Sequence, residues 1–323
     1  MVRGRVVSEG DVADLGTTSE GGMTSGGPRA PKSEMARSCP ACGGDGRDRR
    51  YRVEGRDLLR CELCRTEYLV ESGAEVPATT YWDSYKFELY ADAAVQSEYE
   101  SRYEELVGRV EQRFGPFSSV LDVGCGIGNF VDWAARRWPH AVGVDVDADA
   151  VATARDRGLD VHRADSPSDA VPEGSVDLVT LWDVIEHVAD PHEFLRQACA
   201  SLRPGGLVLI ETPDVRFPLR PLTIAIRKVI EPIRWSDMLY YAEHRMYFSA
   251  RGLSTLMASC GLQIVDEIGM RSPSNKIASI LEIWAEKGAG AGRLGPALFG
   301  PLDASMRAVG MTNKLIMVGR LAP

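Results

Sequence analysis

The 323-residue sequence has little that would suit a membrane protein, a secreted protein or a nucleic-acid-binding protein. No uninterrupted apolar run approaches the ~20 residues that a membrane-spanning helix needs, and residues 1–27 lack the apolar core of a signal peptide. Basic residues are in the minority, 37 Lys+Arg against 46 Asp+Glu, which argues against a protein whose main task is to bind a phosphate backbone. The seven cysteines are an odd number, and a chain of this length needs no disulfide framework. We therefore expect a soluble protein of a reducing, cytoplasmic compartment.

The composition changes along the chain and divides it into parts. Residues 1–38 are rich in Gly, Ser and Thr without apolar periodicity, which predicts a disordered tail. Residues 39–70 form a small cysteine-bearing module, and residues 80–323 are long enough for one large domain. Two stretches interrupt that domain: residues 214–242, which hold three prolines, and residues 272–311, which are expected to be an insertion.

Strand and helix patterns alternate in the large domain. A helix is expected over residues 81–115, where apolar side chains recur at three-and-four spacing. After it, short apolar runs alternate with helical patterns, which indicates an α/β fold with a mostly parallel sheet covered on both faces. The expected strands are 119–123, 141–145, 161–164, 176–181, 207–211, 262–268 and 314–319, and the expected helices include 148–157, 191–202 and 250–260.

Four of the cysteines form two C-x-x-C pairs, Cys39 with Cys42 and Cys61 with Cys64. Two such pairs on tight turns supply the four thiolates of a tetrahedral zinc site. Four protein ligands leave no open coordination position, so the metal is expected to be structural. The alternative is a pair of redox dithiols, although nothing places either pair at the start of a helix. The module is therefore predicted to be a zinc ribbon.

Residues 120–130, VLDVGCGIGNF, are the most informative stretch, because a buried strand runs into a glycine-rich turn and then into a helix. Gly124, Gly126 and Gly128 let the backbone approach a ligand closely, and the helix N-terminus offers N–H groups. The spacing does not match the G-x-G-x-x-G of dinucleotide sites, and Asp122 would put a carboxylate where a pyrophosphate must lie. A ligand that carries an amino group fits this carboxylate better.

The second strand of the pattern ends at Asp145, which lies 21 residues after Gly124. An acidic residue at about this distance from the glycine turn can accept both hydroxyls of a ribose. Together with Asp122, it favours an adenosine that bears a cationic amino-acid chain over a nicotinamide dinucleotide.

Four runs in this order, LDVGCGIGNF, GVDVD, LWDVIEHV and LRPGGLVLIETP, resemble the class I S-adenosylmethionine-dependent methyltransferases. The resemblance covers about residues 80–320 and implies a Rossmann-like sheet whose last strand is antiparallel. It implies that Asp122 and the three glycines face the methionine part of S-adenosylmethionine, and that Asp145 and the adjoining Val146 face the ribose.

The same resemblance implies roles for two residues that follow later strands. Asp165 would meet the adenine amino group, and Trp182 would pack on the adenine or on the methionyl chain. The alternatives are a loop cap for Asp165 and core packing for Trp182. Cys125 is expected to be a small loop residue rather than a nucleophile, since the mechanism needs none.

Two Glu-His pairs are the candidates for the chemistry. Methyl transfer from a sulfonium requires an aligned acceptor and often the removal of one proton. Glu186-His187 follows the fourth strand, at the edge where ligands bind in open α/β sheets. In resembling enzymes this pair lies near the cofactor, and in some quinone O-methyltransferases it contributes to a divalent-metal site. A structural hydrogen bond that shapes the loop is the alternative.

Glu243-His244 precedes an aromatic-Ser step and a helix. A similar pair occurs in sugar C-methyltransferases, which also carry an N-terminal zinc module, and there it serves acid–base chemistry. The resemblance implies that His244 is a base or a substrate ligand, and a helix-entry anchor is the alternative.

Residues 214–242 are expected to form an acceptor lid. Five basic residues between positions 216 and 234 stand against Glu231 alone, beside a set of apolar side chains. This composition suits an anionic or lipid-like acceptor, or peripheral docking at a membrane surface. An amphipathic helix that covers the sheet is the alternative.

The sequence therefore predicts a methyltransferase that uses S-adenosylmethionine, holds a structural Zn²⁺ and acts on a small molecule, either sugar-like or a lipid-like or secondary-metabolite intermediate. One alternative is an RNA base methyltransferase that uses the ribbon for RNA contact. Residues 1–70 carry 12 Lys+Arg and 11 Asp+Glu, so the ribbon is not basic and nucleic acid is not the expected partner. The other alternative is a scaffold that binds the cofactor without turnover, which the two Glu-His pairs disfavour.

Overall fold

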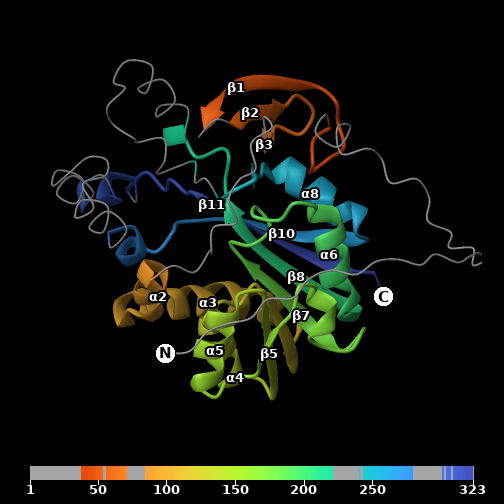
Figure 1. Ribbon diagram of the computed structural model, residues 1–323, viewed down its shortest axis with the longest axis vertical. Helices are drawn as coiled ribbons and strands as arrows, with labels where there is room; N and C mark the ends of the chain where they lie inside the picture. The colour runs from red at the N-terminus through yellow and green to blue at the C-terminus, as the bar shows by residue number, and fades with distance from the viewer. Residues whose placement is uncertain are drawn as a thin grey trace, which may run out of the picture.

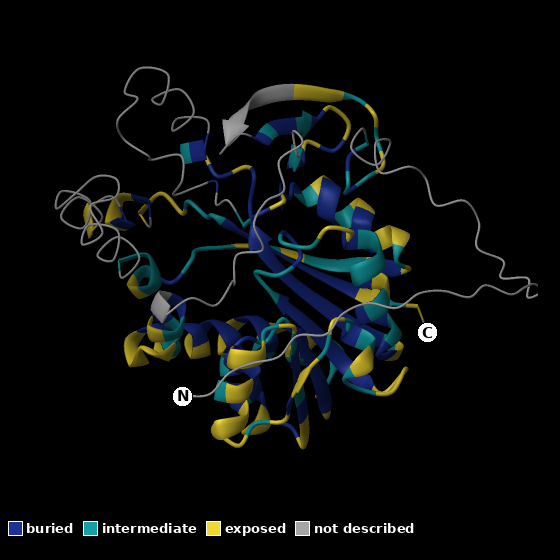
Figure 2. Cartoon of the chain, in the orientation of Figure 1, coloured by how far each residue is buried: buried dark blue, intermediate teal, exposed yellow. Residues whose placement is uncertain are grey.

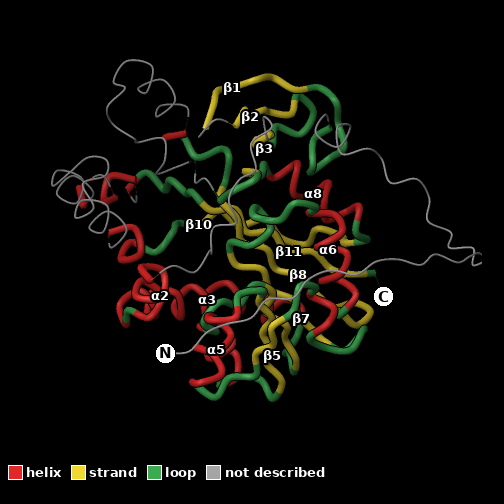
Figure 3. The backbone as a smooth tube through the Cα atoms, viewed as in Figure 1, coloured by secondary structure: helices red, strands yellow, loops and turns green. Residues whose placement is uncertain are grey.

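The computed structural model shows helices on both sides of a central sheet, with a second, smaller group of strands beside it (Figures 1 and 3). Most of the lid of residues 214–242 and of the insertion of residues 272–311, and all of the tail except Ser38, lie outside the described residues. No helix in the described part of the chain combines the length and the apolar character needed to cross a membrane. The described residues are 38–53, 56–70, 84–220, 240, 243–278, 300–301, 303–306 and 308–322.

The central sheet has seven strands. Their bounds are β4 Ser119–Val123, β5 His140–Asp145, β6 Val161–Arg163, β7 Val176–Trp182, β8 Leu202–Pro213, β10 Leu262–Met270 and β11 Lys314–Leu321. They are ordered β10-β11-β8-β7-β4-β5-β6. The strands from β4 to β8 pair in parallel, whereas β11 is antiparallel to both β8 and β10. The predicted Rossmann-like sheet, mostly parallel with an antiparallel last strand, is confirmed.

Successive residues of β8 face opposite sides of the sheet, as the period of two in a strand requires. Val208 and Ile210 pack in one hydrophobic cluster with α6 (Pro191–Ala200) and α8 (Ala250–Ser259). Leu207 and Leu209 pack in a second cluster with α3 (Ala93–Phe114) and α4 (Asn129–Ala135). Figure 2 shows the resulting sheet buried between helices whose outer faces are exposed. Burial on both faces explains why the strands are continuous apolar runs.

The predicted helix over residues 81–115 is two helices, α2 (Ser84–Ala91) and α3. Asp92 separates them in an extended conformation. Its Oδ1 accepts hydrogen bonds from Ala94 N and Val95 N, both at 2.9 Å. An aspartate cap of this kind satisfies N–H groups that have no partner within the helix, so a new helix begins at this point.

The cysteine module forms a second sheet with a segment that lies about 180 residues later in the chain. Its own strands are β1 (Arg47–Val53), β2 (Arg56–Cys61) and β3 (Glu67–Val70). The fourth strand is β9 (Met246–Tyr247), which follows Glu243-His244 and pairs antiparallel with β3. The module therefore docks directly on the segment that carries one of the two Glu-His pairs, above α8 in Figure 1.

Candidate functional site

The turn after β4 is shaped by its glycines, all three of which have positive φ. A Cβ on Gly124 would lie 2.5 Å from Val184 Cγ2, and one on Gly128 would lie 2.6 Å from Leu159 Cδ1. Only glycine tolerates both the backbone conformation and these approaches. The turn thereby delivers the chain into α4, whose N-terminal cap is Gly128.

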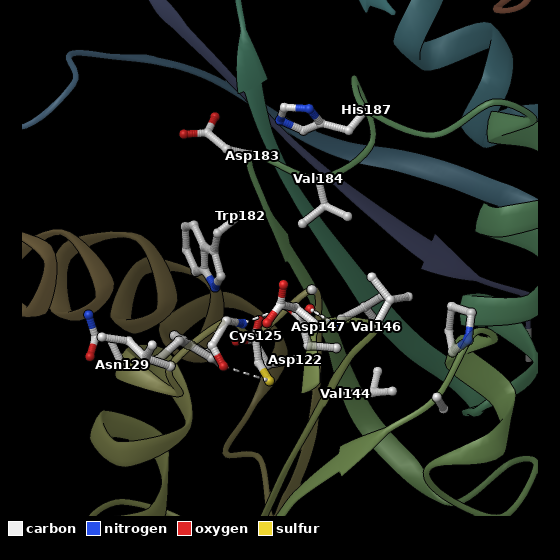
Figure 4. Close-up of a pocket in the computed structure, with 18 of the residues that line it drawn as sticks. Asp122, Cys125, Asn129, Val144, Val146, Asp147, Trp182, Asp183, Val184 and His187 are labelled. Carbon is white, nitrogen blue, oxygen red and sulfur yellow. Dashed lines mark hydrogen bonds between the residues drawn. The ribbon is translucent and has the colours of Figure 1, made fainter. Parts of the chain in front are cut away.

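A cavity of about 540 Å³ opens at the carboxyl ends of the parallel strands, where open α/β sheets bind ligands. In Figure 4, Asp122 and Cys125 lie at one end of it, His187 and Asp183 lie at the other, and Trp182 lies between. Eight of the predicted site residues line this cavity: Asp122, Gly124, Gly126, Asp145, Val146, Asp165, Trp182 and His187. Of the other predicted residues, Gly128, Glu186, Glu243 and His244 are not among the lining residues.

Asp122 is buried and accepts a hydrogen bond of 2.7 Å from Thr180 Oγ1. Its burial and the nearby charge of Asp145 raise its pKa to about 8, against the effect of the Thr180 hydrogen bond. A cation placed beside Asp122 would restore its charge. This is the electrostatic setting for the amino group of a ligand.

Asp145 is fixed by the backbone that surrounds it. Its Oδ2 accepts from Gly126 N at 2.8 Å and its Oδ1 accepts from Asp147 N at 2.9 Å. An ionised carboxylate has about four acceptor positions, so Asp145 keeps acceptor capacity for hydroxyl donors of a ligand. The side chain therefore links the glycine turn to the end of β5 and keeps capacity for a ribose.

Trp182 packs among other aromatic rings as well as lining the cavity. Its ring centroid is 5.0 Å from that of Tyr103 and 5.3 Å from that of Phe130. Core packing and ligand contact are therefore compatible, because Trp182 both contacts these rings and lines the cavity.

His187 faces the cavity with a defined tautomer. Its Nδ1 is 3.1 Å from the carbonyl oxygen of Glu243. A carbonyl oxygen can only accept, so Nδ1 carries the proton and Nε2 carries the lone pair. Burial lowers the pKa of His187 to about 4, so the ring is neutral near pH 7.

The structure brings the two Glu-His pairs together, although corresponding residues of the two pairs are 57 positions apart in the chain. The rings of His187 and His244 meet edge to face with centroids 4.5 Å apart. Glu186 is fully buried, and its Oε2 accepts from Thr212 Oγ1 at 2.9 Å. Glu243 instead forms an ion pair of 2.9 Å with Lys86. Ligand atoms of Glu186, His187 and His244 lie within 4.8 Å of one another, close enough to hold a metal ion.

Asp183 and the tyrosines of the helical wall are lining residues that the sequence analysis missed. Asp183 has φ +57°, which is unusual for a residue other than glycine. Burial alone would raise its pKa, but Lys314 and Lys276 outweigh that effect and lower the pKa to about 2. The position of Asp183 directly after Trp182, at the end of β7, was the sequence feature that could have identified it as a site residue. The tyrosines are Tyr90, Tyr99 and Tyr103 of α2 and α3.

The four predicted zinc ligands converge on one point. All four sulfur atoms lie within 4.8 Å of one another, with Cys39 Sγ 3.7 Å from Cys64 Sγ and Cys42 Sγ 3.6 Å from Cys61 Sγ. A tetrahedron of sulfurs around zinc, with Zn–S of about 2.3 Å, has edges of about 3.8 Å. The cluster therefore has the dimensions of a four-thiolate zinc shell.

The two C-x-x-C turns repeat one hydrogen-bond pattern. Cys39 O accepts from Gly43 N at 2.8 Å, and Cys61 O accepts from Arg65 N at 3.0 Å. The fifth residue of each turn, Gly43 or Arg65, has φ +70°. Equivalent turns present their sulfurs symmetrically, as paired zinc knuckles do.

Comparison with known proteins agrees with this geometry. A family model described as a methyltransferase domain matches residues 95–267, more than half of the chain. That range contains the glycine turn, Asp145 and both Glu-His pairs, and it begins after the cysteine module.

Three curated relatives are similar to parts of the chain. A probable S-adenosylmethionine-dependent methyltransferase of Mycolicibacterium smegmatis is 29% identical over 170 residues, 52% of this chain and 59% of that protein. Trans-aconitate 2-methyltransferase of Rhodococcus jostii is 34% identical over 160 residues, 49% of this chain and 59% of that protein. A ubiquinone biosynthesis O-methyltransferase of Xanthomonas euvesicatoria is 29% identical over 202 residues, 60% of this chain and 80% of that protein.

The match to the first two of these relatives thus spans about three-fifths of their length. The family model, the curated relatives, the seven-stranded sheet and the cavity at the glycine turn agree with one another. The chain belongs to the class I S-adenosylmethionine-dependent methyltransferases.

Proposed function

We propose that the protein transfers the methyl group of S-adenosylmethionine to a small-molecule acceptor. One observation carries the proposal: a single cavity joins Asp122 and Asp145, which suit the cofactor, to His187, which suits proton transfer. Asp122 would pair with the amino group of the methionyl chain, Asp145 would accept the ribose hydroxyls, Asp165 would meet the adenine and Trp182 would flank the ligand.

The reaction is an in-line displacement at the methyl carbon. A lone pair of the acceptor forms the new bond to carbon, the bond between carbon and the sulfonium sulfur breaks, and its electron pair neutralises the sulfur. S-adenosylhomocysteine leaves, and the acceptor loses one proton to a base. The protein contributes by holding the two reactants in line and by removing that proton.

His187 is the base in this proposal, with His244 as its supporting residue. The fixed tautomer leaves the lone pair on Nε2, a buried atom of a ring that borders the cavity. His244 is buried and packs edge to face against His187, so it restricts the orientation of that ring. Glu186 and Glu243 fix the surrounding loop through Thr212 and Lys86.

The acceptor is proposed to be sugar-like, or a lipid-like or secondary-metabolite intermediate. The names of two relatives, trans-aconitate 2-methyltransferase and a ubiquinone biosynthesis O-methyltransferase, refer to small molecules. The tyrosines at the cavity wall offer both apolar rings and hydroxyls to such a compound.

The cysteine cluster is proposed to hold one structural Zn²⁺. Four sulfurs at tetrahedral spacing support this assignment, and a closed four-thiolate shell supplies folding energy rather than catalysis. Metal analysis should find about one zinc per chain, and Cys61→Ser should abolish its retention, whereas Cys199→Ser should not. A stable, metal-free chain would refute the assignment.

Calorimetry with S-adenosylmethionine tests the cofactor site. Asp145→Asn should raise Kd by about 10- to 100-fold, because each hydrogen bond with a charged group contributes roughly 1.5–3 kcal/mol. The exposed Asp160→Asn should leave Kd unchanged. Binding without methyl transfer to any compound in a broad acceptor panel would favour the non-catalytic scaffold, and salt-dependent binding and methylation of RNA would favour the RNA enzyme.

A further inference from the structure

The cysteine module of residues 39–70, the proposed zinc ribbon, shares a sheet with the segment that carries His244, through the pairing of β3 with β9. We propose that the metal-bound ribbon positions the imidazole pair of His187 and His244, and that Glu67 of β3 is the positioning residue that transmits this effect. The inference rests on the proposed function, since it assigns a second role to the same site.

A continuous line of contacts connects the cavity to the ribbon. The ring of His187 meets His244 at 4.5 Å, His244 meets Tyr247 at 5.3 Å and Tyr247 meets Tyr240 at 5.0 Å, all between centroids. The line ends on the ribbon, where Tyr240 OH donates a hydrogen bond of 3.0 Å to Glu67 Oε2.

This line is excluded from water along most of its length. Tyr247 and Tyr240 are 0% and 1% exposed, and Glu67 is 5% exposed. The guanidinium carbon of Arg220 lies 4.2 Å from the ring centroid of Tyr247 and 4.8 Å from that of Tyr240. Buried rings that are packed on both sides have few alternative rotamers. A change at Glu67 should therefore shift the position of the His244 ring.

The backbone of residues 243–247 is held from two directions. On the ribbon side, Leu69 N donates to Arg245 O at 2.8 Å. On the cavity side, Glu186 O accepts from Arg245 N at 2.8 Å and from Met246 N at 3.2 Å. The width of one strand thus separates the ribbon from the loop that carries His187.

A second anchor ties a metal ligand to the end of the same segment. Ser249 Oγ donates to the carbonyl oxygen of Cys64, and Ser249 Oγ also accepts from Gly252 N at 2.9 Å at the start of α8. When zinc fixes Cys64, it also fixes the register of residues 64–68. Both the pairing of β3 with β9 and the hydrogen bond of Ser249 to Cys64 depend on that register. A ribbon of this size depends on its metal for folding, so metal loss would release β3 from β9.

Three variants test this with amide hydrogen exchange of residues 243–249 and with ¹³C and ¹⁵N histidine NMR. Cys61→Ser and Glu67→Ala should each speed exchange at Met246 and Tyr247 by at least tenfold and convert His187 from the Nδ1–H tautomer to a mixture. Tyr240→Phe removes only the phenol oxygen and should reproduce the tautomer change with a smaller change in exchange. Glu67→Gln retains an acceptor for Tyr240 and should restore the wild-type values.

The matched controls are Cys260→Ser and the exposed Glu62→Gln, neither of which should change exchange or tautomer. The Kd for S-adenosylhomocysteine should stay within about twofold in every variant that folds, because none of the described residues that line the cavity belongs to the module. Unchanged exchange and an unchanged His187 signal in both Glu67→Ala and zinc-free protein would overturn the inference. Failure of the wild-type protein to bind S-adenosylhomocysteine would instead refute the proposed function and leave the exchange result standing.

Discussion

The rings of His187 and His244 lie edge to face, with centroids 4.5 Å apart. Both are buried, and burial lowers both pKa values, that of His187 to about 4. Two neutral imidazoles can lie this close without charge repulsion, and a neutral ring is the form that accepts a proton. Both rings are therefore in the form that can accept a proton near pH 7, while burial makes each a weaker base than an exposed imidazole.

Replacement of His187 by glutamine should reduce methyl transfer by about 10²- to 10⁴-fold, the usual contribution of a general base. The Kd of the cofactor should hardly change, because the proposed cofactor contacts lie at the other end of the cavity. The measurement is S-adenosylhomocysteine formed with an acceptor that the wild-type protein methylates. His192→Gln is the matched control, since His192 is half-buried, hydrogen-bonded to Ser259 and not among the residues that line the cavity. Equal losses in both variants would reject the assignment.

Asp122 predicts how cofactor affinity depends on pH. Its pKa is raised to about 8 in the free protein, mainly by burial, so below pH 8 it holds a proton that a cationic amino group must displace. Affinity should therefore rise with pH, by up to about tenfold per unit. Above about pH 8 the amino group of the ligand itself loses its proton, so affinity should fall again. Calorimetry across pH 6–9 measures this maximum.

The matched variant is Asp122→Asn, which keeps the shape of the side chain and removes its titration. It should bind more weakly at pH 8 and should lose the rise between pH 6 and pH 8. A wild-type affinity that is flat over this range would show that Asp122 does not pair with the amino group.

The succession of strands along the chain and the position of the glycine turn could be predicted from the sequence because they depend on local patterns. Residues 119–123 were expected as a strand and form β4 without change. The predicted start of β8 is wrong, because the strand begins at Leu202 rather than at residue 207. Leu202 pairs with Val176, and a register shift follows before Leu178 pairs with Leu207. The strand therefore passes through Gly205 and Gly206, which in isolation resemble the end of an element.

The relationships that complete the site could not be predicted, because they join residues far apart in the chain. β9 has only two residues, and its pairing with β3 is defined by a partner about 180 residues away. Asp183 owes its low pKa to Lys314, which is 131 residues away. Hydrophobic periodicity reports which face of an element is buried, and it carries no information on which elements meet.

Replacement of one partner of the buried ion pair of Arg102 and Glu211 should strongly lower the free energy of unfolding. Both residues are less than 9% exposed, and Arg102 also donates to Arg271 O. Arg102→Met leaves the buried carboxylate of Glu211 without its charge partner, which should lower the free energy of unfolding by about 3–5 kcal/mol. The double variant Arg102→Met/Glu211→Met should recover much of that loss. Urea unfolding measures all three proteins.

The surface pair of Arg109 and Asp266 provides the control for that experiment. It has good bidentate geometry, at 2.8 and 3.0 Å, but the Arg109 side chain is 57% exposed. The Asp266 side chain is 11% exposed, but solvent screens the Arg109 end of the pair, so Arg109→Met should lower the free energy of unfolding by no more than about 1 kcal/mol. Similar losses at both pairs would contradict the importance assigned to burial.

Two glycine-to-alanine substitutions in helices should have opposite effects on stability. In α8, a Cβ on Gly252 would lie 2.0 Å from Thr66 Oγ1 of the ribbon, so Gly252→Ala should lower the free energy of unfolding by about 1–3 kcal/mol through overpacking. In α3, a Cβ on Gly108 would have no neighbour within 4 Å. Gly108→Ala should therefore stabilise the protein by roughly 0.5–1 kcal/mol, the helix preference of alanine.

The contact with Thr66 supplies the decisive check. Thr66→Ala removes the closest atom, so in the double variant the cost of Gly252→Ala should be smaller than in the wild-type background. If the two costs are equal, the ribbon does not pack on α8 as closely as the contact between Gly252 and Thr66 requires. The difference between the two costs is the coupling free energy between residue 252 of α8 and Thr66 of the cysteine module. It tests the contact between the module and the methyltransferase domain by unfolding alone, without any substrate.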